Sequence, residues 1–134
     1  MILQSGAIPY LIRNGRIHYV IITSNNTGNW IFPKGMIEPD MTAAESAANE
    51  AFEEAGVTGT IEDKPLGRFT YEKFGREITV DMYPLKVDIV HDDWQEPWRD
   101  RKVCEAEEVL DIIDERQFSM FQKASPLIMA RIFR

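Results

Sequence analysis

The feature that most constrains this chain is a helix-forming segment at residues 42–55, which has strand-like sequence on both sides. Thr42 and Glu45 have the spacing of a capping box, and Gly56 is placed to end the helix. At about 100° per residue, one face of this helix carries small residues and one aromatic ring. The members of this face are Ala44, Ala47, Ala48, Ala51, Phe52 and Ala55. We therefore expect the stripe to be buried and the helix to lie close against a sheet.

Most of the remaining sequence predicts strands. Apolar runs at residues 4–12 and 16–23 flank Asn14-Gly15, a pair typical of tight β-hairpin turns. The other expected elements are strands at residues 30–32, 58–61, 66–71, 77–90 and 103–106, turns at 33–35 and 74–76, a loop at 92–102, and helices at 114–122 and 126–133. A chain of 134 residues has the common size of one domain, so we expect a single domain over residues 1–134.

Charge and cysteine content limit the partners that we expect. The formal net charge is −7, and the chain has no basic face of the kind that binds a nucleic acid polymer or an anionic membrane. No apolar run reaches the roughly 20 residues that span a bilayer, and the first residues lack a signal-peptide pattern, so we expect a cytoplasmic location. Cys104 is the single cysteine, and only His18 and His91 accompany it. Any metal would therefore be held mainly by oxygen ligands.

Three glutamates crowd one flank of the predicted helix. Glu50, Glu53 and Glu54 fall within about 100° of one another, and Glu50 and Glu54 are one turn apart. Such like-charge pairs cost about 0.2–0.5 kcal/mol on an exposed helix. The flank could simply be solvated, or a divalent cation could bridge the carboxylates. Gly35 can adopt a loop conformation that aims its backbone carbonyl at the same flank, and this set of oxygens suits magnesium or manganese.

Residues 35–57 resemble the signature of the Nudix hydrolases, G-x5-E-x7-R-E-U-x-E-E-x-G-U, where U is a bulky aliphatic residue. The total spacing is preserved, and the matching residues are Gly35, Glu50, Glu53, Glu54, Gly56 and Val57. Met41 stands at the first glutamate of the signature and Asn49 at its arginine, with a milder departure at Ala51. In the family this arginine helps to orient the glutamates. The resemblance implies an α/β/α sandwich with a mixed central β-sheet.

The same resemblance implies roles for individual residues. Glu50, Glu53 and Glu54 would be the catalytic and metal-binding residues, the Gly35 carbonyl a further metal ligand, and Mg²⁺ the cofactor, with Mn²⁺ as a substitute. The general base stays open: it could be one of the three glutamates of the signature helix or a residue outside it, and the candidates outside it are Glu96, Glu105, Glu107 and Glu108.

Basic residues near these acids are candidates for contacting substrate phosphate. Lys34 adjoins the metal site in sequence, although it could also be an ordinary surface lysine. Arg76 and Arg101 are candidates of the same kind, and so is Arg68.

The implied activity is Mg²⁺-dependent hydrolysis of a pyrophosphate bond in a nucleoside diphosphate linked to another moiety. Within the family, the sequence is similar to the diadenosine polyphosphate and diphosphoinositol polyphosphate hydrolases. Because inositol pyrophosphates require a dense basic pocket, a dinucleoside polyphosphate or a nucleotide-sugar-like substrate fits the charge of this chain better, and the first of these is the expected substrate. The alternatives are a diphosphoinositol polyphosphate phosphohydrolase and a non-catalytic module that binds a nucleotide ligand. The oligomeric state stays open.

Overall fold

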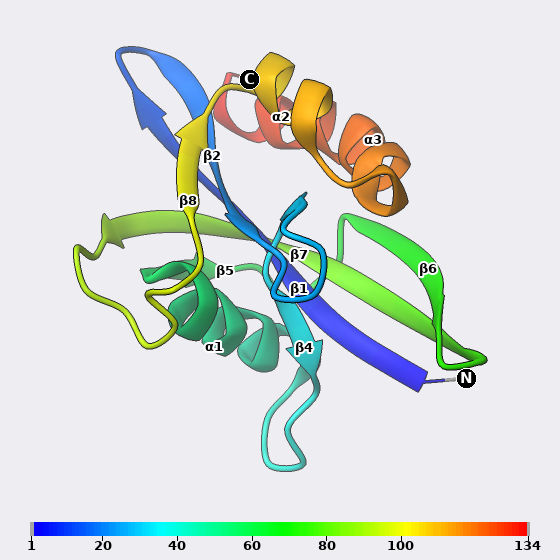
Figure 1. The fold of residues 1–134 in the computed structure, drawn as a ribbon. Coiled ribbons are helices and arrows are strands. Elements are labelled where there is room, and N and C mark those ends of the chain that lie inside the picture. Colours follow the sequence, from blue (N-terminus) through cyan, green and yellow to red (C-terminus); the bar gives the residue numbers. More distant parts are fainter. Residues whose placement is uncertain (1, 134) are drawn as a thin grey trace.

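A mixed β-sheet forms the centre of the computed structural model, which describes residues 2–133 (Figure 1). Its strands are β1 (Ile2–Arg13), β2 (Arg16–Thr23), β3 (Trp30–Ile31), β4 (Lys34–Met36), β5 (Val57–Ile61), β6 (Gly67–Lys73), β7 (Arg76–Val90) and β8 (Arg101–Cys104). The main path runs β3-β2-β1-β7-β5, while β4 pairs with β1, β6 with β7 and β8 with β2. The β1–β7 pair is parallel and the other pairs are antiparallel. The sheet is therefore mixed, as predicted.

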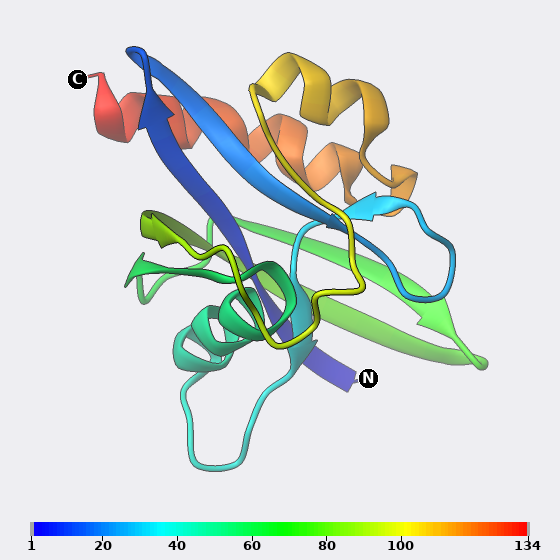
Figure 2. The ribbon, with the colours of Figure 1, turned by 60° about the vertical axis from the view of Figure 1, so that its left-hand side comes forward.

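Helices cover both faces of the sheet. Helix α1 (Ala43–Ala55) lies on one face, and α2 (Ala106–Ile112) and α3 (Glu115–Ile132) lie on the other. Figure 2 shows the same three layers from a second direction, with α3 running along the opposite side of the sheet from α1. The α/β/α sandwich expected from the sequence is confirmed. Among residues 2–133, no helix combines the length and apolarity needed to span a membrane.

Side-chain alternation along the strands creates two separate cores. On β2, Tyr19 and Ile21 face α2 and α3, whereas Val20 and Ile22 face α1. The core under α3 contains large side chains, including Phe121. The core under α1 is completed by four alanines of the helix: Ala44, Ala47, Ala51 and Ala55. The small side chains let the axis of α1 approach the sheet closely.

The ends of α1 follow the sequence signals. The Thr42 hydroxyl accepts a hydrogen bond from the backbone N–H of Glu45, and the Glu45 carboxylate accepts one from the backbone N–H of Thr42. Gly56 then adopts a left-handed conformation with φ of 65° and ends the helix. The β1–β2 turn also forms as predicted, with positive φ at Asn14 and Gly15.

The predicted buried face of α1 was partly wrong. Phe52 is 44% exposed, and its ring lies edge-on to His91. Glu54 is buried instead, at 5% exposure. The helical angle alone could not distinguish the two positions, because β4 and the loop after β7 cover one flank of α1 and leave the other open.

Three element boundaries also differ from the prediction. Residues 33–35 were expected in a turn, but residues 34–36 pair with β1 as β4. The predicted strand at 103–106 begins earlier, at Arg101, and Ala106 already belongs to α2. The two expected C-terminal helices are one helix, α3, which continues through Pro126. Pro126 is solvent-exposed, while Ala124 and Ile128 on either side of it are buried, so packing holds the helix together across the missing N–H.

Candidate active site

Two glutamates of α1 meet the backbone of β4. A Cβ atom on Gly35 would overlap the Glu50 carboxyl group, so only a glycine leaves room for this side chain. One turn further along, Oε1 of Glu54 accepts a 3.4 Å hydrogen bond from the backbone N–H of Lys34. The Glu50 and Glu54 side chains are also hydrogen-bonded to each other. Strand β4 thus holds residues 34–35 against a pair of carboxyl groups.

Burial shifts the proton affinity of this pair. It raises the pKa of Glu50, and repulsion from Glu53 adds to the effect. Burial also raises the pKa of Glu54, to about 9, and the hydrogen bond and repulsion from Glu50 act in the same direction. A buried carboxyl pair that retains a proton at neutral pH is a good acceptor for a divalent cation, because the cation can replace the proton as the neutralising charge.

The donor chemistry of the pair fits a hard cation such as Mg²⁺ or Mn²⁺. Glu50, Glu54 and the backbone of Gly35 would hold the ion. Over residues 2–133, no three acidic, histidine or cysteine side chains converge on one ready-made ion position. Glu53 is half-buried on the same helix flank, and its role as a third ligand stays a prediction.

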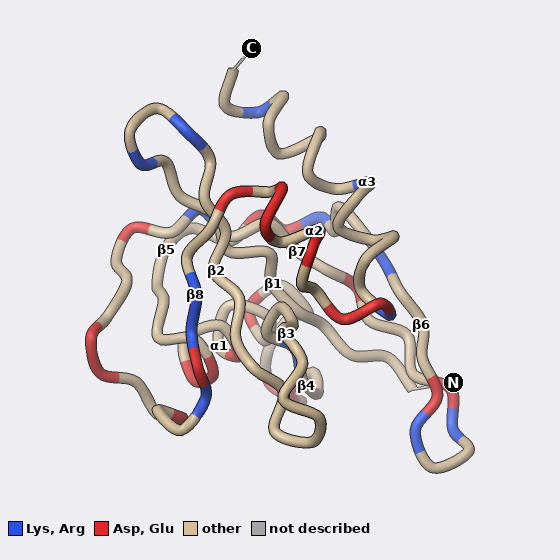
Figure 3. The backbone as a smooth tube through the Cα atoms, turned by 45° about the horizontal axis from the view of Figure 1, so that its top comes forward, with Lys and Arg blue, Asp and Glu red and all other residues tan. Residues whose placement is uncertain are grey.

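The loop between β7 and β8 adds a further acidic residue and a cation to this site. Glu96 donates its backbone N–H to the carbonyl of Glu53 at 3.1 Å, which ties the loop to α1. Arg99 lies next to Glu96, with Nη2 at 3.0 Å from Oε1 of Glu96 and at 4.0 Å from Oε1 of Glu54. Acidic positions gather on α1 and around α2 (Figure 3). Of these acidic regions, the one on α1 has a buried arginine from another element beside it.

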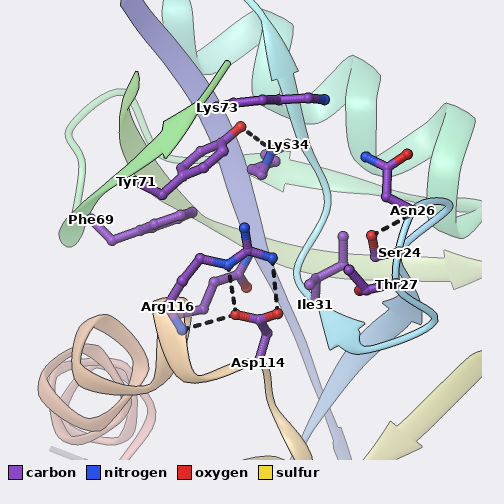
Figure 4. A pocket seen from close by; sticks show the side chains of 11 residues that line it. Ser24, Asn26, Thr27, Ile31, Lys34, Phe69, Tyr71, Lys73, Asp114 and Arg116 are labelled. Atoms are coloured by element: carbon purple, nitrogen blue, oxygen red, sulfur yellow. Dashed lines mark hydrogen bonds and ion pairs between the residues drawn. The ribbon is translucent and has the colours of Figure 1, made fainter. Parts of the chain in front are cut away.

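A cavity of about 200 Å³ adjoins the site and is shown in Figure 4. Phe69 and Tyr71 of β6 form one wall, with ring centroids 6.0 Å apart and an interplanar angle of 24°. Two cations approach the Tyr71 ring: the Nζ of Lys34 at 4.7 Å from its centroid and the guanidinium carbon of Arg116 at 5.5 Å. The opposite wall contains the polar residues Ser24, Asn26 and Thr27, with Ile31 beside them.

Asp114 fixes the floor of this cavity. Its carboxylate accepts hydrogen bonds from Nε and Nη2 of Arg116 at 3.0 and 3.1 Å and from the side chain of Asn29 at 3.1 Å. The bonds from Arg116 are the main reason that the pKa of Asp114 is lowered to about 2. Asp114 also caps the N-terminus of α3 by accepting a bond from the backbone N–H of Arg116. The charge of Arg116 is therefore largely neutralised within the protein.

Lys34 connects the cavity with the carboxyl pair. Its backbone N–H points to Glu54, and its Nζ donates a 2.8 Å hydrogen bond to the Tyr71 hydroxyl inside the cavity. A substrate in the cavity would thus meet a cation one residue away from Gly35. The sequence-based suggestion that Lys34 contacts a substrate phosphate stays a prediction, and this placement supports it.

Of the other three predicted phosphate ligands, Arg68 donates to the Asp81 carboxylate on β7, and the remaining two lie elsewhere. Arg76 is exposed at the start of β7 and pairs with Lys73 across the β6–β7 hairpin. Arg101 donates from Nη1 to the carbonyls of Ala55 and His91 at 3.0 and 2.7 Å, and its guanidinium lies 4.1 Å from the centroid of Trp94. These bonds give Arg101 a structural role at the end of α1, and neither arginine lines the cavity.

The four candidate bases also separate in space. Glu96 lies at the carboxyl pair. Glu105 pairs with Arg16, Glu108 pairs with Lys102, and Glu107 shares with them a groove between the β1–β2 hairpin and α3. Of these four, Glu96 is the one positioned beside Glu54.

Sequence reasoning missed several residues of the site. Arg99 was contained in a segment read as a charged loop, and Tyr71, Asp114 and Arg116 were treated only as parts of a strand or a helix. A local signal existed for Asp114, because an aspartate just before a helical segment is a common N-cap. The alignment of these residues with Lys34 depends on tertiary contacts between β4, β6 and α3, which no local pattern specifies.

The fold and the acidic helix define a class of protein: an α/β/α sandwich with carboxylates clustered on the helix that follows a glycine-containing strand. Comparison with known proteins gives the same class. The chain belongs to the Nudix family, since the NUDIX domain matches residues 5–125.

One similar protein is Nudix hydrolase 12, mitochondrial, from Arabidopsis thaliana, with 31% identity covering 82% of this chain and 65% of that protein. Another is diphosphoinositol polyphosphate phosphohydrolase 2 from Rattus norvegicus, with 34% identity covering 58% of this chain and 41% of that protein. The chain thus spans less than two thirds of the length of these two relatives.

A solved structure of similar fold is the Ap4A hydrolase binary complex from C. elegans. It has a TM-score of 0.76 and 23% identity, and the match covers 97% of this chain and 99% of that chain.

Proposed function

We propose that this protein is a Mg²⁺-dependent hydrolase that cleaves a phosphoanhydride bond in a small molecule, and that its preferred substrate is a dinucleoside polyphosphate. The observation that carries the proposal is the double role of Lys34, whose backbone contacts Glu54 while its ammonium group lies in the aromatic cavity. This residue connects a place for one end of a substrate with a place for a metal ion.

The cavity supports binding of one planar, apolar-faced group. Its volume of about 200 Å³ is below the roughly 300–1,000 Å³ of sites that enclose a whole drug-sized ligand. We infer that only one end of the substrate enters it, while the remainder extends along the surface. Tyr71 and Phe69 offer apolar faces for a nucleobase, and Lys34 would contact the first phosphates.

Each site residue has a distinct task in this proposal. Glu50 and Glu54 would hold the cation, and Glu96 lies where it could accept a proton from an attacking water. A bound Mg²⁺ would supply charge neutralisation on the phosphate oxygens and lower the pKa of a coordinated water. Lys34 would orient the phosphate chain so that the scissile bond lies over the carboxyl pair.

The charge of the cavity favours a nucleotide over an inositol pyrophosphate. Its basic side chains are Lys34, Lys73 and Arg116, and Asp114 neutralises the last of these. A polyphosphorylated inositol carries phosphates on many sides and needs a denser set of cations. Similarity to a diphosphoinositol polyphosphate phosphohydrolase keeps this substrate as the second candidate.

The test is a hydrolysis panel of dinucleoside polyphosphates, nucleotide sugars, nucleoside triphosphates and inositol pyrophosphates, each with and without Mg²⁺. We expect the dinucleoside polyphosphates to be cleaved best and the activity to fall by about 10²- to 10⁴-fold in Glu54→Gln. Glu62→Gln is the matched control, because Glu62 is a half-buried glutamate that pairs with Arg131 of α3 and not with the carboxyl pair. Best turnover of inositol pyrophosphates would overturn the substrate assignment. An inert wild type that still binds nucleotides would favour the non-catalytic module.

Lys34→Met tests the connecting residue in the same assay. We expect its KM for the best substrate to rise more than that of Arg76→Met, because Lys34 lines the cavity and Arg76 lies at the hairpin tip. Equal effects in the two variants would mean that the substrate follows another path across the surface.

A further inference from the structure

Helix α1 carries a dense acidic cluster without any basic residue of its own. Its sequence from Ala43 to Ala55 contains Glu45, Glu50, Glu53 and Glu54 and no lysine or arginine. Asn49, at the position where the signature has arginine, is neutral. A buried carboxylate is strongly unfavourable unless a proton or a positive charge neutralises it, and any arginine or lysine that does so here must come from another element.

Arg99 has the required position and burial. Its side chain is 10% exposed and that of Glu54 is 7% exposed, so solvent screens their interaction only weakly. Nη2 of Arg99 lies 4.0 Å from Oε1 of Glu54 and 3.0 Å from Oε1 of Glu96, and Nε donates a second bond to Oε1 of Glu96 at 3.0 Å. One guanidinium group therefore contacts two glutamates from different segments.

The loop that carries Arg99 is fixed on both sides of it. Nη1 of Arg99 donates to the carbonyl of Thr23 at 2.9 Å, and the backbone N–H of Asp100 donates to the Thr23 hydroxyl at 2.9 Å. The backbone N–H of Glu96 reaches the carbonyl of Glu53 at 3.1 Å. These anchors hold the guanidinium group in one position. A charged group must have a fixed position in order to orient its partners.

We propose that Arg99 is a positioning residue, which supplies from the β7–β8 loop the positive charge that α1 lacks and sets the relative orientation of Glu54 and Glu96. The inference rests on the proposed function, since it assumes that these carboxylates serve a metal site. It assigns no contact between Arg99 and the substrate. The competing explanation is that Arg99 only fastens the loop to Thr23.

The experiment replaces Arg99 and then restores an arginine at a different position. The variants are Arg99→Met, Arg99→Lys and the double variant Arg99→Met/Asn49→Arg, which moves the charge onto α1. Arg131→Met is the matched control, because Arg131 also pairs with a glutamate, Glu62, and also donates to a backbone carbonyl, that of Leu127. Circular dichroism first establishes that each variant is folded, and Arg99→Lys replaces Arg99→Met if the latter unfolds.

The first readout is Mn²⁺ affinity of the metal-free protein, measured by electron paramagnetic resonance, and the second is kcat and KM on the best substrate of the panel. We expect Arg99→Met to lose about 10- to 100-fold in Mn²⁺ affinity and in kcat with little change in KM, the cost typical of removing a residue that supports metal ligands. Arg99→Lys should recover part of the loss, since an ammonium group cannot contact two carboxylates as a planar guanidinium does. The double variant should recover most of it.

Two outcomes would overturn the inference alone: an Arg99→Met variant within twofold of the wild type, or a double variant that shows no recovery, which would assign Arg99 to loop fastening. A wild type that neither binds Mn²⁺ nor hydrolyses the panel would overturn the proposed function, and this inference with it.

Discussion

The two faces of the sheet are built from opposite kinds of side chain. Under α3, the rings of Tyr19, Phe32 and Phe121 interlock, with Tyr19 and Phe121 edge-to-face at 4.8 Å between centroids and Phe32 and Phe121 at 5.2 Å. Under α1, the helix contributes alanines, and the one large ring on this helix, Phe52, points outward. Aromatic side chains bury far more apolar surface than alanines do, so the α3 face should supply most of the hydrophobic stabilisation.

This difference separates stability from chemistry. Alanines give little apolar stabilisation, but they allow close approach, and close approach is what buries Glu54 beside the backbone of Lys34. The apolar packing under α3 offsets the free-energy cost of burying Glu54. We therefore expect mutations on the α3 face to change unfolding free energy and mutations on the α1 face to change metal binding and catalysis.

The largest effect should come from Phe121→Ala. Phe121 is fully buried between two other rings, so its removal leaves a cavity and should cost about 3–5 kcal/mol of unfolding free energy. Urea denaturation monitored by circular dichroism measures this loss. Phe118→Ala on the same helix is the control, because Phe118 is 36% exposed and should cost much less. A comparable loss in both variants would contradict the central place of the aromatic cluster.

A smaller and different effect is expected for Gly35→Ala on the other face. The new Cβ would overlap the Glu50 carboxyl group and push that side chain away from β4. We expect kcat/KM to fall by about 10- to 100-fold while the urea midpoint changes little. The control is Gly67→Ala, whose Cβ would meet only the flexible side chain and the backbone carbonyl of Met120 on the α3 face. If Gly35→Ala kept full activity, the close contact between Gly35 and Glu50 would be irrelevant to function.

The sequence predicted those features that local rules determine. The capping box fixed the start of α1, the Asn14-Gly15 pair fixed the first hairpin, and the spacing of Glu50, Glu53 and Glu54 located the acidic site. The depth of Glu54 escaped prediction because it depends on β4 and the β7–β8 loop. Arg99 escaped because its partner Glu54 is far away in sequence, and nothing in a charged loop indicates which residue turns inward.

The opposite kind of error occurred at Pro126, where a local rule predicted a helix end that tertiary packing overrides. A proline usually ends a helix, and the sequence was therefore divided there. In α3 the buried residues Phe121, Ala124 and Ile128 continue on one face across the proline, and their packing outweighs the lost hydrogen bond. Tertiary packing decided this boundary, as it decided the burial of Glu54.

The α1 face should also make the stability of the protein depend on pH, through Glu54. Because burial raises the pKa of Glu54 from 4.5 to about 9, the folded state binds more protons than the unfolded state within this window. The contribution of protonated Glu54 to folding stability is fully present at low pH, and the free energy of unfolding decreases as the pH rises toward 9. Glutamine is neutral throughout, so metal-free Glu54→Gln should be more stable than the wild type at pH 8, with a Tm higher by several degrees.

Thermal melts at pH 5 and pH 8, each with EDTA or with Mg²⁺, measure this difference. The difference in Tm between the wild type and Glu54→Gln should be smaller at pH 5. At pH 8, Mg²⁺ should raise the Tm of the wild type but not that of Glu54→Gln. Parallel pH dependence in the two proteins would show that Glu54 is not the group that titrates.

The smallest effect is expected at the N-terminus of α1. Thr42→Ala removes the hydroxyl that accepts from the backbone N–H of Glu45, which should cost about 1 kcal/mol. Glu45→Gln is the matched control, because its amide oxygen can still accept from the backbone N–H of Thr42. The change lies three turns from Glu54, so Mn²⁺ affinity should stay at the wild-type value. If Thr42→Ala weakened Mn²⁺ binding together with stability, the metal site would depend on the whole of α1, and the separation between a stabilising face and a chemical face would fail.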